Sequence, residues 1–232
     1  MLLGKEATAR LSRTRVAIFG IGGVGGYALE ALVRTGVGHI DIIDSDKVSP
    51  SNLNRQIIAT ERTVGMDKVT LAAERAREIN SDVEVTPINL FYSAECADAL
   101  DLSKYDYIID AIDTVSSKCT LIEDATNKGV PIISCMGTGG KLNPTSLEVS
   151  DIYKTSVCPL ARVMRAECKK REIKRLKVVY STEEPIKETV EDSVMGKFTR
   201  RVPGSVVFVP AAAGFILAAE AIKDILGKKD EK

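Results

Sequence analysis

The sequence predicts an α/β fold, a doubly wound Rossmann-like sheet that is mainly parallel and gains mixed strands in its C-terminal half. In the first half, short runs rich in β-branched residues alternate with helical segments, which is typical of parallel βαβ units. A turn with four glycines separates the first run from the first helical segment, as in nucleotide-binding folds. From about residue 145 the alternation changes, which indicates strands of mixed orientation.

Each element of the first half follows from a local pattern. A short buried strand is expected at 15–19, and a helix at 24–36 that ends at Gly36. The helix expected at 66–80 carries apolar residues on one face. The remaining strands of this half are expected at 39–44, 83–90, 105–112 and 131–137.

The second half predicts a strand at 145–152, a basic helix at 158–175, a strand at 178–181 and a core helix at 205–226. The polar stretch 182–204 has no apolar periodicity, so we expect a mobile loop over the site or a surface excursion. We expect one domain, with a nucleotide-binding core at 12–140, a substrate-facing region at 141–204 and a terminal core helix at 205–226.

Charge and apolar patterning exclude several classes of protein. Lys plus Arg and Asp plus Glu both total 32, so no overall charge draws the chain to nucleic acid or membrane, and any polyanion site must be local. The most apolar segment, 206–219, contains Pro210 and stops at Glu220, which favours a buried helix over a membrane span. The first residues carry charges and no long apolar run, so we expect no secretory signal there.

The cysteines and the histidine of the sequence limit which metal sites and disulfides are expected. Five cysteines without a C-x-x-C pair argue against a disulfide framework and a zinc ribbon, and favour a reducing cytoplasm. Cys158 stands at a helix start, where thiol pKa values fall, yet a structural or incidental role is favoured. The single histidine, His39, is expected to be structural.

The glycine turn and the next strand predict a nucleotide site. Backbone N–H groups of such a turn approach phosphate at the positive end of a helix, and Asp44 stands where a carboxylate accepts ribose hydroxyls. Taken alone, this pattern favours NAD, and glycines that serve only a tight turn are the alternative. The glycines concerned are Gly20, Gly22, Gly23 and Gly25.

Amides and cations past Asp44 favour a reacting triphosphate over a dinucleotide. Asn52 and Arg55 share a face of a short helical turn, and Lys68 begins the next helix. The carboxylate of Asp113, with Asp110 in reserve, suits Mg²⁺, which takes one or two carboxylates plus phosphate oxygens. Solvated surface charges and a helix cap remain the alternative explanation for these residues.

The motifs GIGGVG, DSDKVSPSNLNRQ, GMDK and DAID occur in this order and closely resemble the ThiF/MoeB/HesA superfamily, bacterial relatives of ubiquitin-activating enzymes. The resemblance covers about residues 12–140. It implies a homodimer that adenylates a carboxylate with ATP and Mg²⁺. It also implies ribose binding by Asp44, metal binding by Asp113, and phosphate contacts from Asn52, Arg55 and Lys68. The same motifs supply Asp46 and Gln56 to the expected nucleotide site, and Arg55, Lys68 and Asp113 are the expected catalytic residues.

The C-terminal half resembles the tRNA threonylcarbamoyladenosine dehydratase branch, through GTGGKLNPTSLEVSDIYKTSVCPLARVMR and PGSVVFVPAAAGFILA. This branch activates the carboxylate of the modified adenosine of a tRNA and closes it into a ring with loss of AMP. The expected tRNA contacts are Arg162, Arg165 and Lys169, with a solvated helix face as the alternative. The resemblance also implies an arm arginine from the dimer partner, which Arg13 and Arg15 do not match.

Two other functions stay open at this point. One is an activating enzyme for a ubiquitin-like sulfur carrier, with a possible sulfur-transfer partner, against which the lack of paired cysteines counts. The other is a nucleotide-binding module without catalysis.

Overall fold

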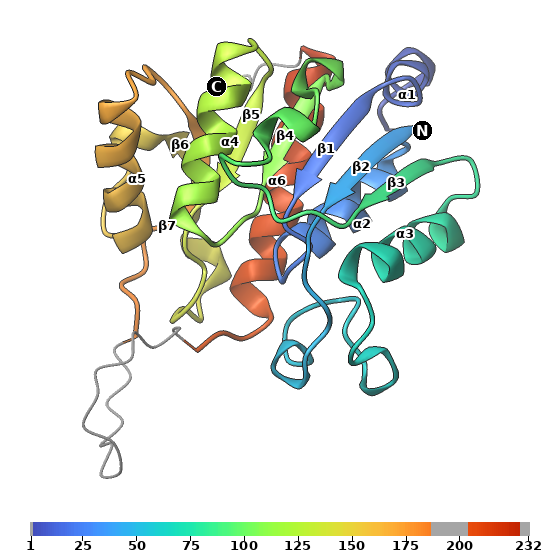
Figure 1. Ribbon diagram of the computed structural model, residues 1–232, viewed down its shortest axis with the longest axis horizontal. Helices are drawn as coiled ribbons and strands as arrows, with labels where there is room; N and C mark the ends of the chain where they lie inside the picture. The colour runs from blue at the N-terminus through green and yellow to red at the C-terminus, as the bar shows by residue number, and fades with distance from the viewer. Residues whose placement is uncertain (1, 187–203, 228–232) are drawn as a thin grey trace.

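In the described part of the chain, seven strands form one sheet in the order β3-β2-β1-β4-β5-β7-β6 (Figure 1). The computed structural model describes residues 2–186 and 204–227. All strand pairs are parallel except β6 with β7. The predicted doubly wound, mainly parallel sheet is therefore confirmed. The strands are β1 Arg15–Phe19, β2 His39–Ile43, β3 Glu84–Ile88, β4 Tyr107–Asp110, β5 Ile132–Cys135, β6 Leu147–Asp151 and β7 Lys177–Ser181.

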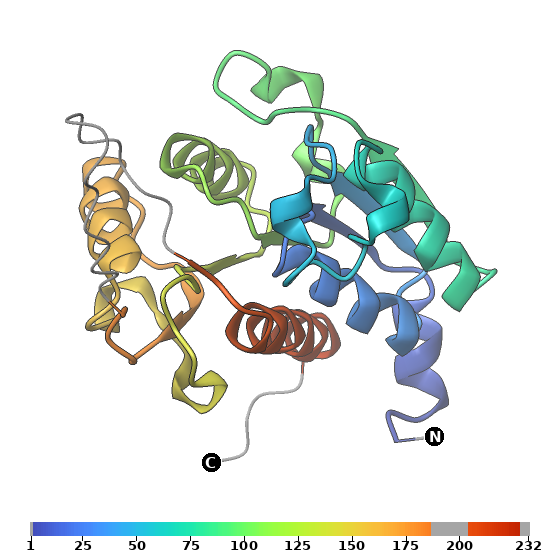
Figure 2. The same cartoon turned by 90° about the horizontal axis from the view of Figure 1, so that it is seen from below.

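Helices cover both faces of the sheet. Figure 2 shows α4 on one side of the sheet and α2 and α6 on the other. The helices are α1 Lys5–Leu11, α2 Gly25–Thr35, α3 Lys68–Ile79, α4 Val115–Asn127, α5 Pro159–Lys170 and α6 Phe208–Leu226. The short helix α1 and the bounds of α4 were not among the elements that the sequence predicts.

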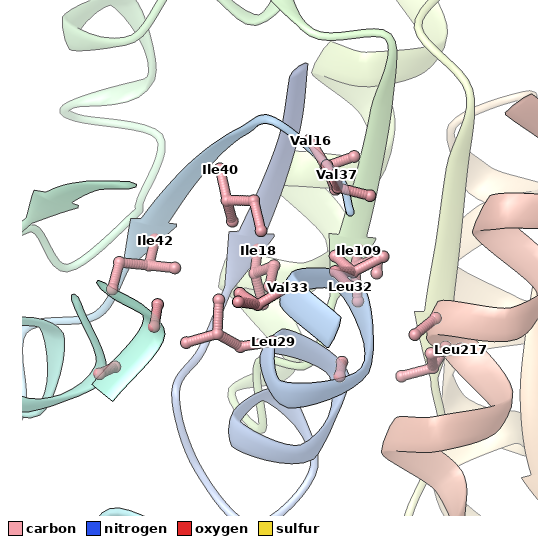
Figure 3. Close-up of a cluster of buried hydrophobic side chains, with 14 of the residues drawn as sticks. Val16, Ile18, Leu29, Leu32, Val33, Val37, Ile40, Ile42, Ile109 and Leu217 are labelled. Atoms are coloured by element: carbon pink, nitrogen blue, oxygen red, sulfur yellow. The ribbon is translucent and has the colours of Figure 1, made fainter. Parts of the chain in front are cut away.

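The largest apolar cluster lies between the sheet and the helices α2 and α6 (Figure 3). Ile18 of β1, Ile40 of β2 and Ile109 of β4 face Leu32 of α2 and Leu217 of α6, and all five are fully buried. Each such side chain contributes about 1.5–3 kcal/mol when it leaves water. This cluster fixes α2 against β1, and with it the glycine turn between them.

Helix α5 ends at Lys170, five residues before the predicted end. Glu172 has a left-handed backbone, with φ of 56°, which stops the helix. The turn lets Ile173 and Leu176 enter a second apolar cluster, where each is 3% exposed. Burial of these two side chains thus overrides the helical pattern of the sequence. Most of the predicted polar loop, 187–203, lies outside the described residues.

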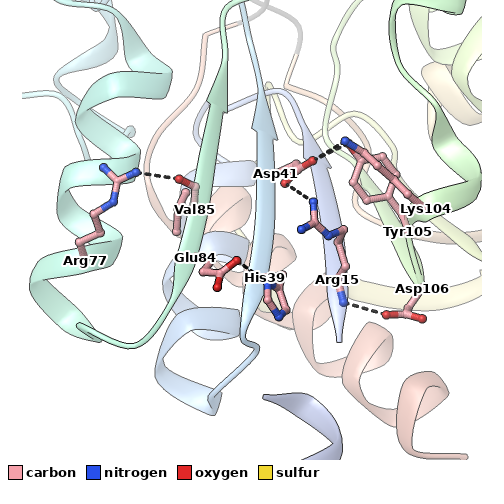
Figure 4. Close-up of polar contacts among 9 residues, drawn as sticks. All are labelled: Arg15, His39, Asp41, Arg77, Glu84, Val85, Lys104, Tyr105 and Asp106. Carbon is pink, nitrogen blue, oxygen red and sulfur yellow. Dashed lines mark hydrogen bonds and ion pairs between the residues drawn. The ribbon is translucent and has the colours of Figure 1, made fainter. Parts of the chain in front are cut away.

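Away from the glycine turn, polar side chains connect strands with one another and with the segment that precedes β4 (Figure 4). His39 pairs with Glu84 across β2 and β3, with Nδ1 2.9 Å from Oε2, which fits the structural role expected for this histidine. Buried Asp41 accepts from Tyr105 over 2.8 Å and lies 3.0 Å from the Lys104 ammonium. None of the described helices is long and apolar enough to cross a membrane.

Candidate nucleotide-binding site

A cavity of about 480 Å³ opens at the carboxyl edge of the sheet, where the chain leaves β1, β2 and β4. The strand order reverses between β1 and β4, and open α/β sheets bind ligands at such a switch point. The predicted residues that line it are Gly20, Gly22, Gly23, Asp44, Asp46, Asn52, Arg55, Gln56, Lys68 and Asp113. The fold therefore brings together residues that lie up to 93 positions apart.

The glycine turn is shaped by two close backbone approaches. Gly20 has φ of 90°, and a Cβ there would lie 2.7 Å from the Ala111 carbonyl oxygen. A Cβ at Gly25 would lie 1.8 Å from the Gly20 carbonyl oxygen, so no side chain fits. Gly25 does not line the cavity; it lets α2 begin directly behind the turn. A Cβ at Gly22 would meet only Gln56 Nε2, at 3.9 Å, and Gly22 lines the cavity, so its backbone is accessible to a ligand.

Asp44 holds the turn from the end of β2. Its carboxylate accepts the Ile21 N–H over 2.6 Å and the Asp46 N–H over 2.8 Å. Burial raises the pKa of this carboxyl, while the nearby Lys68 ammonium opposes that shift. Lys68 Nζ lies 3.9 Å from Asp44 Oδ2. A ribose hydroxyl at this carboxylate would be next to a cation.

Lys68 is the first residue of α3 and is almost buried, with 6% of its side chain exposed. Its ammonium lies 2.7 Å from Asp46 Oδ2. The backbone N–H of Lys68 also donates to the Asp46 carbonyl oxygen, over 3.1 Å. These contacts direct a long, flexible side chain toward the cavity.

Arg55 also lines the cavity, and it follows the 3-10 turn Pro50–Asn52. Its guanidinium donates to the Ser51 carbonyl oxygen over 2.7 Å and to Asn54 Oδ1 over 3.0 Å. Asn54 in turn donates to the Ser205 carbonyl oxygen over 2.7 Å. Asn54 therefore connects Arg55 with the segment that enters α6, a link that the spacing alone does not reveal.

The two carboxylates at the end of β4 have different environments. Asp113 is exposed and lines the cavity. Asp110 is fully buried, does not line the cavity, and bonds with Lys118 and Ser134. The expectation that Asp110 stands in reserve as a metal ligand is therefore wrong, because a carboxylate with these partners has no access to a ligand.

Two buried polar atoms of the cavity wall have no hydrogen-bond partner among the described residues. They are Gln56 Oε1 and the Ser117 hydroxyl, in residues that are 6% and 2% exposed. Buried polar groups are nearly always satisfied, so orphans in a cavity wall point to a ligand. Ser117 was missed because a serine in the first turn of a helix carries no distinctive signal.

Other lining residues were also missed by the sequence patterns. Phe91 is 57% exposed, and Leu90 and Tyr92 flank it just after β3. Tyr92 packs edge-on against Phe19, with ring centroids 5.0 Å apart. Their position after a strand of the same edge was the available signal, and these apolar side chains suit a base more than phosphates.

The predicted tRNA contacts lie on α5, well separated in sequence from the cavity residues. Arg162 and Lys169 are exposed. Arg165 is partly buried and donates to both the carbonyl oxygen and the hydroxyl of Thr155, over 2.9 and 2.5 Å. One of the three cations is thus engaged in holding the loop before α5. Cys158 caps the start of this helix and is buried.

Comparison with known proteins identifies the lineage of this site. The model of the ThiF family matches residues 1–232. This chain belongs to the ThiF family. The predicted resemblance is thereby confirmed, and the matching region extends beyond the residues 12–140 on which the motifs lie.

Within the ThiF family, the tRNA threonylcarbamoyladenosine dehydratase of Bacillus subtilis is 38% identical over 97% of this chain and 92% of its own length. A solved structure of the Escherichia coli tRNA N6-threonylcarbamoyladenosine dehydratase with AMP has a TM-score of 0.88, at 33% identity, and covers 98% of this chain and 92% of that one. The same enzyme with ATP gives 0.85, at 33% identity, over 98% and 91% of the two chains.

A relative that is named for sulfur transfer matches less of the chain. An adenylyltransferase and sulfurtransferase from Culex quinquefasciatus is 35% identical over 57% of this chain and 30% of its own length. The dehydratases, in contrast, match nearly the whole chain including its C-terminal half, as the sequence motifs there predict.

Proposed function

We propose that this chain is an ATP-dependent tRNA-modifying enzyme that adenylates the carboxylate of N6-threonylcarbamoyladenosine and cyclises it with loss of AMP. The observation that carries this proposal is the cavity, which gathers a glycine turn, Arg55, Lys68 and Asp113 around one volume. A dinucleotide pyrophosphate needs little more than backbone amides, whereas a triphosphate that reacts needs fixed cations. The names and ligands of the similar dehydratases support the same reading.

In the first step, a substrate carboxylate oxygen forms a bond to the α-phosphorus of ATP, and the bond from that phosphorus to the bridging oxygen breaks. The electron pair leaves with pyrophosphate, so negative charge grows on the leaving group. Arg55 and Lys68 both line the cavity and neutralise this charge. The glycine turn offers backbone N–H groups to the phosphates, and Asp44 accepts from the ribose.

In the second step, a nucleophilic atom of the substrate's own side chain loses its proton to solvent and attacks the activated carboxyl carbon, and AMP departs with the bonding pair. The ring closure is intramolecular, for which good geometry is worth on the order of 7–11 kcal/mol. No protein nucleophile is needed, which agrees with the burial of Cys158.

The donor set fits Mg²⁺ bound with the nucleotide. Within residues 2–186 and 204–227, no three His, Cys, Asp or Glu side chains gather as a metal cage. Mg²⁺ commonly takes one or two carboxylates plus phosphate oxygens, and Asp113 offers an exposed carboxylate on the cavity wall. We assign Mg²⁺ binding to Asp113; the ion would supply charge neutralisation at the phosphates.

We extend the proposal to the tRNA and to a second copy of the chain. Three cations of α5 would contact tRNA phosphates, namely Arg162, Arg165 and Lys169.

Two exposed aromatic side chains lie on the same face of α6. Phe208 is 57% exposed and Phe215 is 47% exposed, and Phe215 packs against Tyr27. Exposed aromatic side chains on one face are typical of an interface, which supports the predicted homodimer.

Three further predictions from the sequence stay predictions. They are a single adenylating domain, divided at residues 12–140, 141–204 and 205–226, a sulfur-transfer partner, and a cytoplasmic location.

ATP–pyrophosphate exchange tests the proposed function against its alternatives. The assay uses modified tRNA, a sulfur-carrier protein, or neither as the carboxylate donor, with Mg²⁺ present. We expect exchange only with the tRNA. Exchange with the carrier instead would support the sulfur-carrier function, and exchange with neither would support a nucleotide-binding module.

A further inference from the structure

We infer that the buried pair Asp110–Lys118 is a positioning device for Asp113, and that it sets the affinity of the site for the divalent cation. This inference rests on the proposed metal role of Asp113. Neither side chain touches the cavity, and both are 0% exposed. They act through the backbone that leads to Asp113.

Asp110 has two polar side-chain partners in the protein interior. Lys118 Nζ lies 2.8 Å from Asp110 Oδ2, and the Ser134 hydroxyl donates to the same oxygen over 2.5 Å. A fully buried ion pair contributes little net stability compared with apolar side chains of the same size. Its presence beside a cavity therefore calls for another explanation than stability.

The contacts of the pair with the backbone of Ile112 suggest a positioning role. Lys118 Nζ donates to the Ile112 carbonyl oxygen over 3.0 Å, and the Ile112 N–H donates to Asp110 Oδ1 over 3.1 Å. Both polar backbone groups of Ile112 are thus bound by the pair. Ile112 immediately precedes Asp113, so the pair fixes the peptide from which the Asp113 carboxylate projects.

The same segment supports the glycine turn. The Ala111 N–H donates to the Phe19 carbonyl oxygen over 2.8 Å. The missing side chain of Gly20 allows the turn to approach the Ala111 carbonyl oxygen. The pair therefore holds the metal carboxylate at a fixed place relative to the phosphate-binding turn. Partners that orient a metal ligand without touching the metal typically change affinity 10- to 100-fold when they are lost.

The test compares variants for their affinity for Mn²⁺ in the presence of ATP, measured by electron paramagnetic resonance. The Mg²⁺ concentration for half-maximal pyrophosphate exchange is a second readout. The main variant combines Asp110→Asn with Lys118→Met, which removes both charges and leaves no unpaired buried ion. Ser134→Ala is a milder variant that keeps both charges. Ile122→Ala is the control, because Ile122 is also fully buried on α4 but packs in the second apolar cluster, which contains neither Ile112 nor a residue of the cavity wall.

We expect the double variant to lose at least about tenfold in Mn²⁺ affinity, and to need a correspondingly higher Mg²⁺ concentration. Metal-free ATP affinity, measured by calorimetry in a chelator, should stay within about threefold of wild type, because the pair does not line the cavity. Ser134→Ala should shift the metal affinity in the same direction by less. Ile122→Ala should lower the melting temperature without a shift in metal affinity.

Wild-type metal affinity in the folded double variant would overturn the inference, and so would an equal shift in Ile122→Ala. If the double variant does not fold, Ser134→Ala decides the question alone. Asp113→Asn separates the two proposals. If its metal affinity is that of wild type, the proposed metal role is wrong and the positioning role falls with it. If only Asp113→Asn has an effect, the inference alone is wrong.

Discussion

Lys68 contacts Asp46 twice, through its backbone N–H over 3.1 Å and through its ammonium, which lies 2.7 Å from the carboxylate. The lysine is almost buried, whereas 67% of the Asp46 side chain is exposed. Without a nucleotide, the carboxylate is thus the partner of the cation that we assign to the phosphates. A triphosphate in the cavity would compete for the same ammonium.

Replacing the two members of this pair should have unequal effects. Lys68→Met removes a fixed cation from the site of the leaving group, and we expect the rate of pyrophosphate exchange to fall about 10²- to 10³-fold. Asp46→Ala should cost less than about tenfold, because the start of α3 still directs Lys68 toward the cavity. Equal losses in both variants would mean that Lys68 acts only as the partner of Asp46.

Ser117→Ala should change stability and affinity in opposite directions. An unsatisfied buried polar group costs about 1–3 kcal/mol, so its removal should raise the melting temperature of the free protein by a few degrees. The variant should bind ATP about three- to tenfold more weakly, as expected for one lost hydrogen bond. A lower melting temperature by scanning calorimetry, or unchanged ATP affinity, would show that the hydroxyl does not await a ligand.

Two glycines of the turn should respond differently to alanine. A Cβ at Gly25 meets the Gly20 carbonyl oxygen at 1.8 Å, so we expect Gly25→Ala to misfold or melt far below wild type. At Gly22 a Cβ meets only Gln56 Nε2, at 3.9 Å, so Gly22→Ala should melt like wild type. Its added methyl should still weaken ATP binding about tenfold or more, because it blocks close approach of phosphate to the backbone. Calorimetry with and without ATP measures both effects.

The pH dependence of nucleotide binding should report on Asp44. Burial raises the pKa of its carboxyl, so the folded protein takes up this proton at a higher pH than the unfolded chain does. The group therefore adds stability as the pH falls through that pKa and loses this contribution as the pH rises. Ribose binding uses the ionised form, so ATP affinity should fall over the same acidic interval, above the ordinary aspartate value of about 3.9. Asp44→Ala should bind ATP weakly at every pH, without this transition.

The cations of α5 should differ in their effect on tRNA binding. Arg162→Ala should weaken binding and reduce the slope of log affinity against log salt by about 0.7–0.9, the value for one phosphate contact. Arg165→Ala should weaken binding and also lower the melting temperature, because Arg165 holds Thr155. Unchanged binding across a salt titration of the double variant would reject the proposed tRNA surface.

Local spacing made much of the site predictable. The glycine turn, Asp44, Arg55 and Lys68 each follow a strand end or helix start within a few residues, and parallel strands place their carboxyl ends together. Because these residues follow strands that end at the same edge of the sheet, a common cavity could be expected from the sequence.

The parts that were missed depend on contacts between distant segments. Lys118 looks like any lysine of an exposed helix, and only its contact with Asp110 explains its complete burial. Phe91 follows β3 at the same edge, but it lies in an irregular segment, so the strand pattern does not show that its side chain lines the cavity. The early end of α5 depends on burial of Ile173 against distant residues, which outweighs a good helical pattern.

The most direct test of the central claim is mass analysis of anticodon nucleosides after modified tRNA is incubated with ATP, Mg²⁺ and this protein. We predict that the threonylcarbamoyl nucleoside becomes lighter by one water while an equal amount of AMP forms, and that Arg55→Ala and Asp113→Asn greatly slow this conversion. An unchanged nucleoside, conversion that uses NAD in place of ATP, or full turnover by both variants would contradict the account.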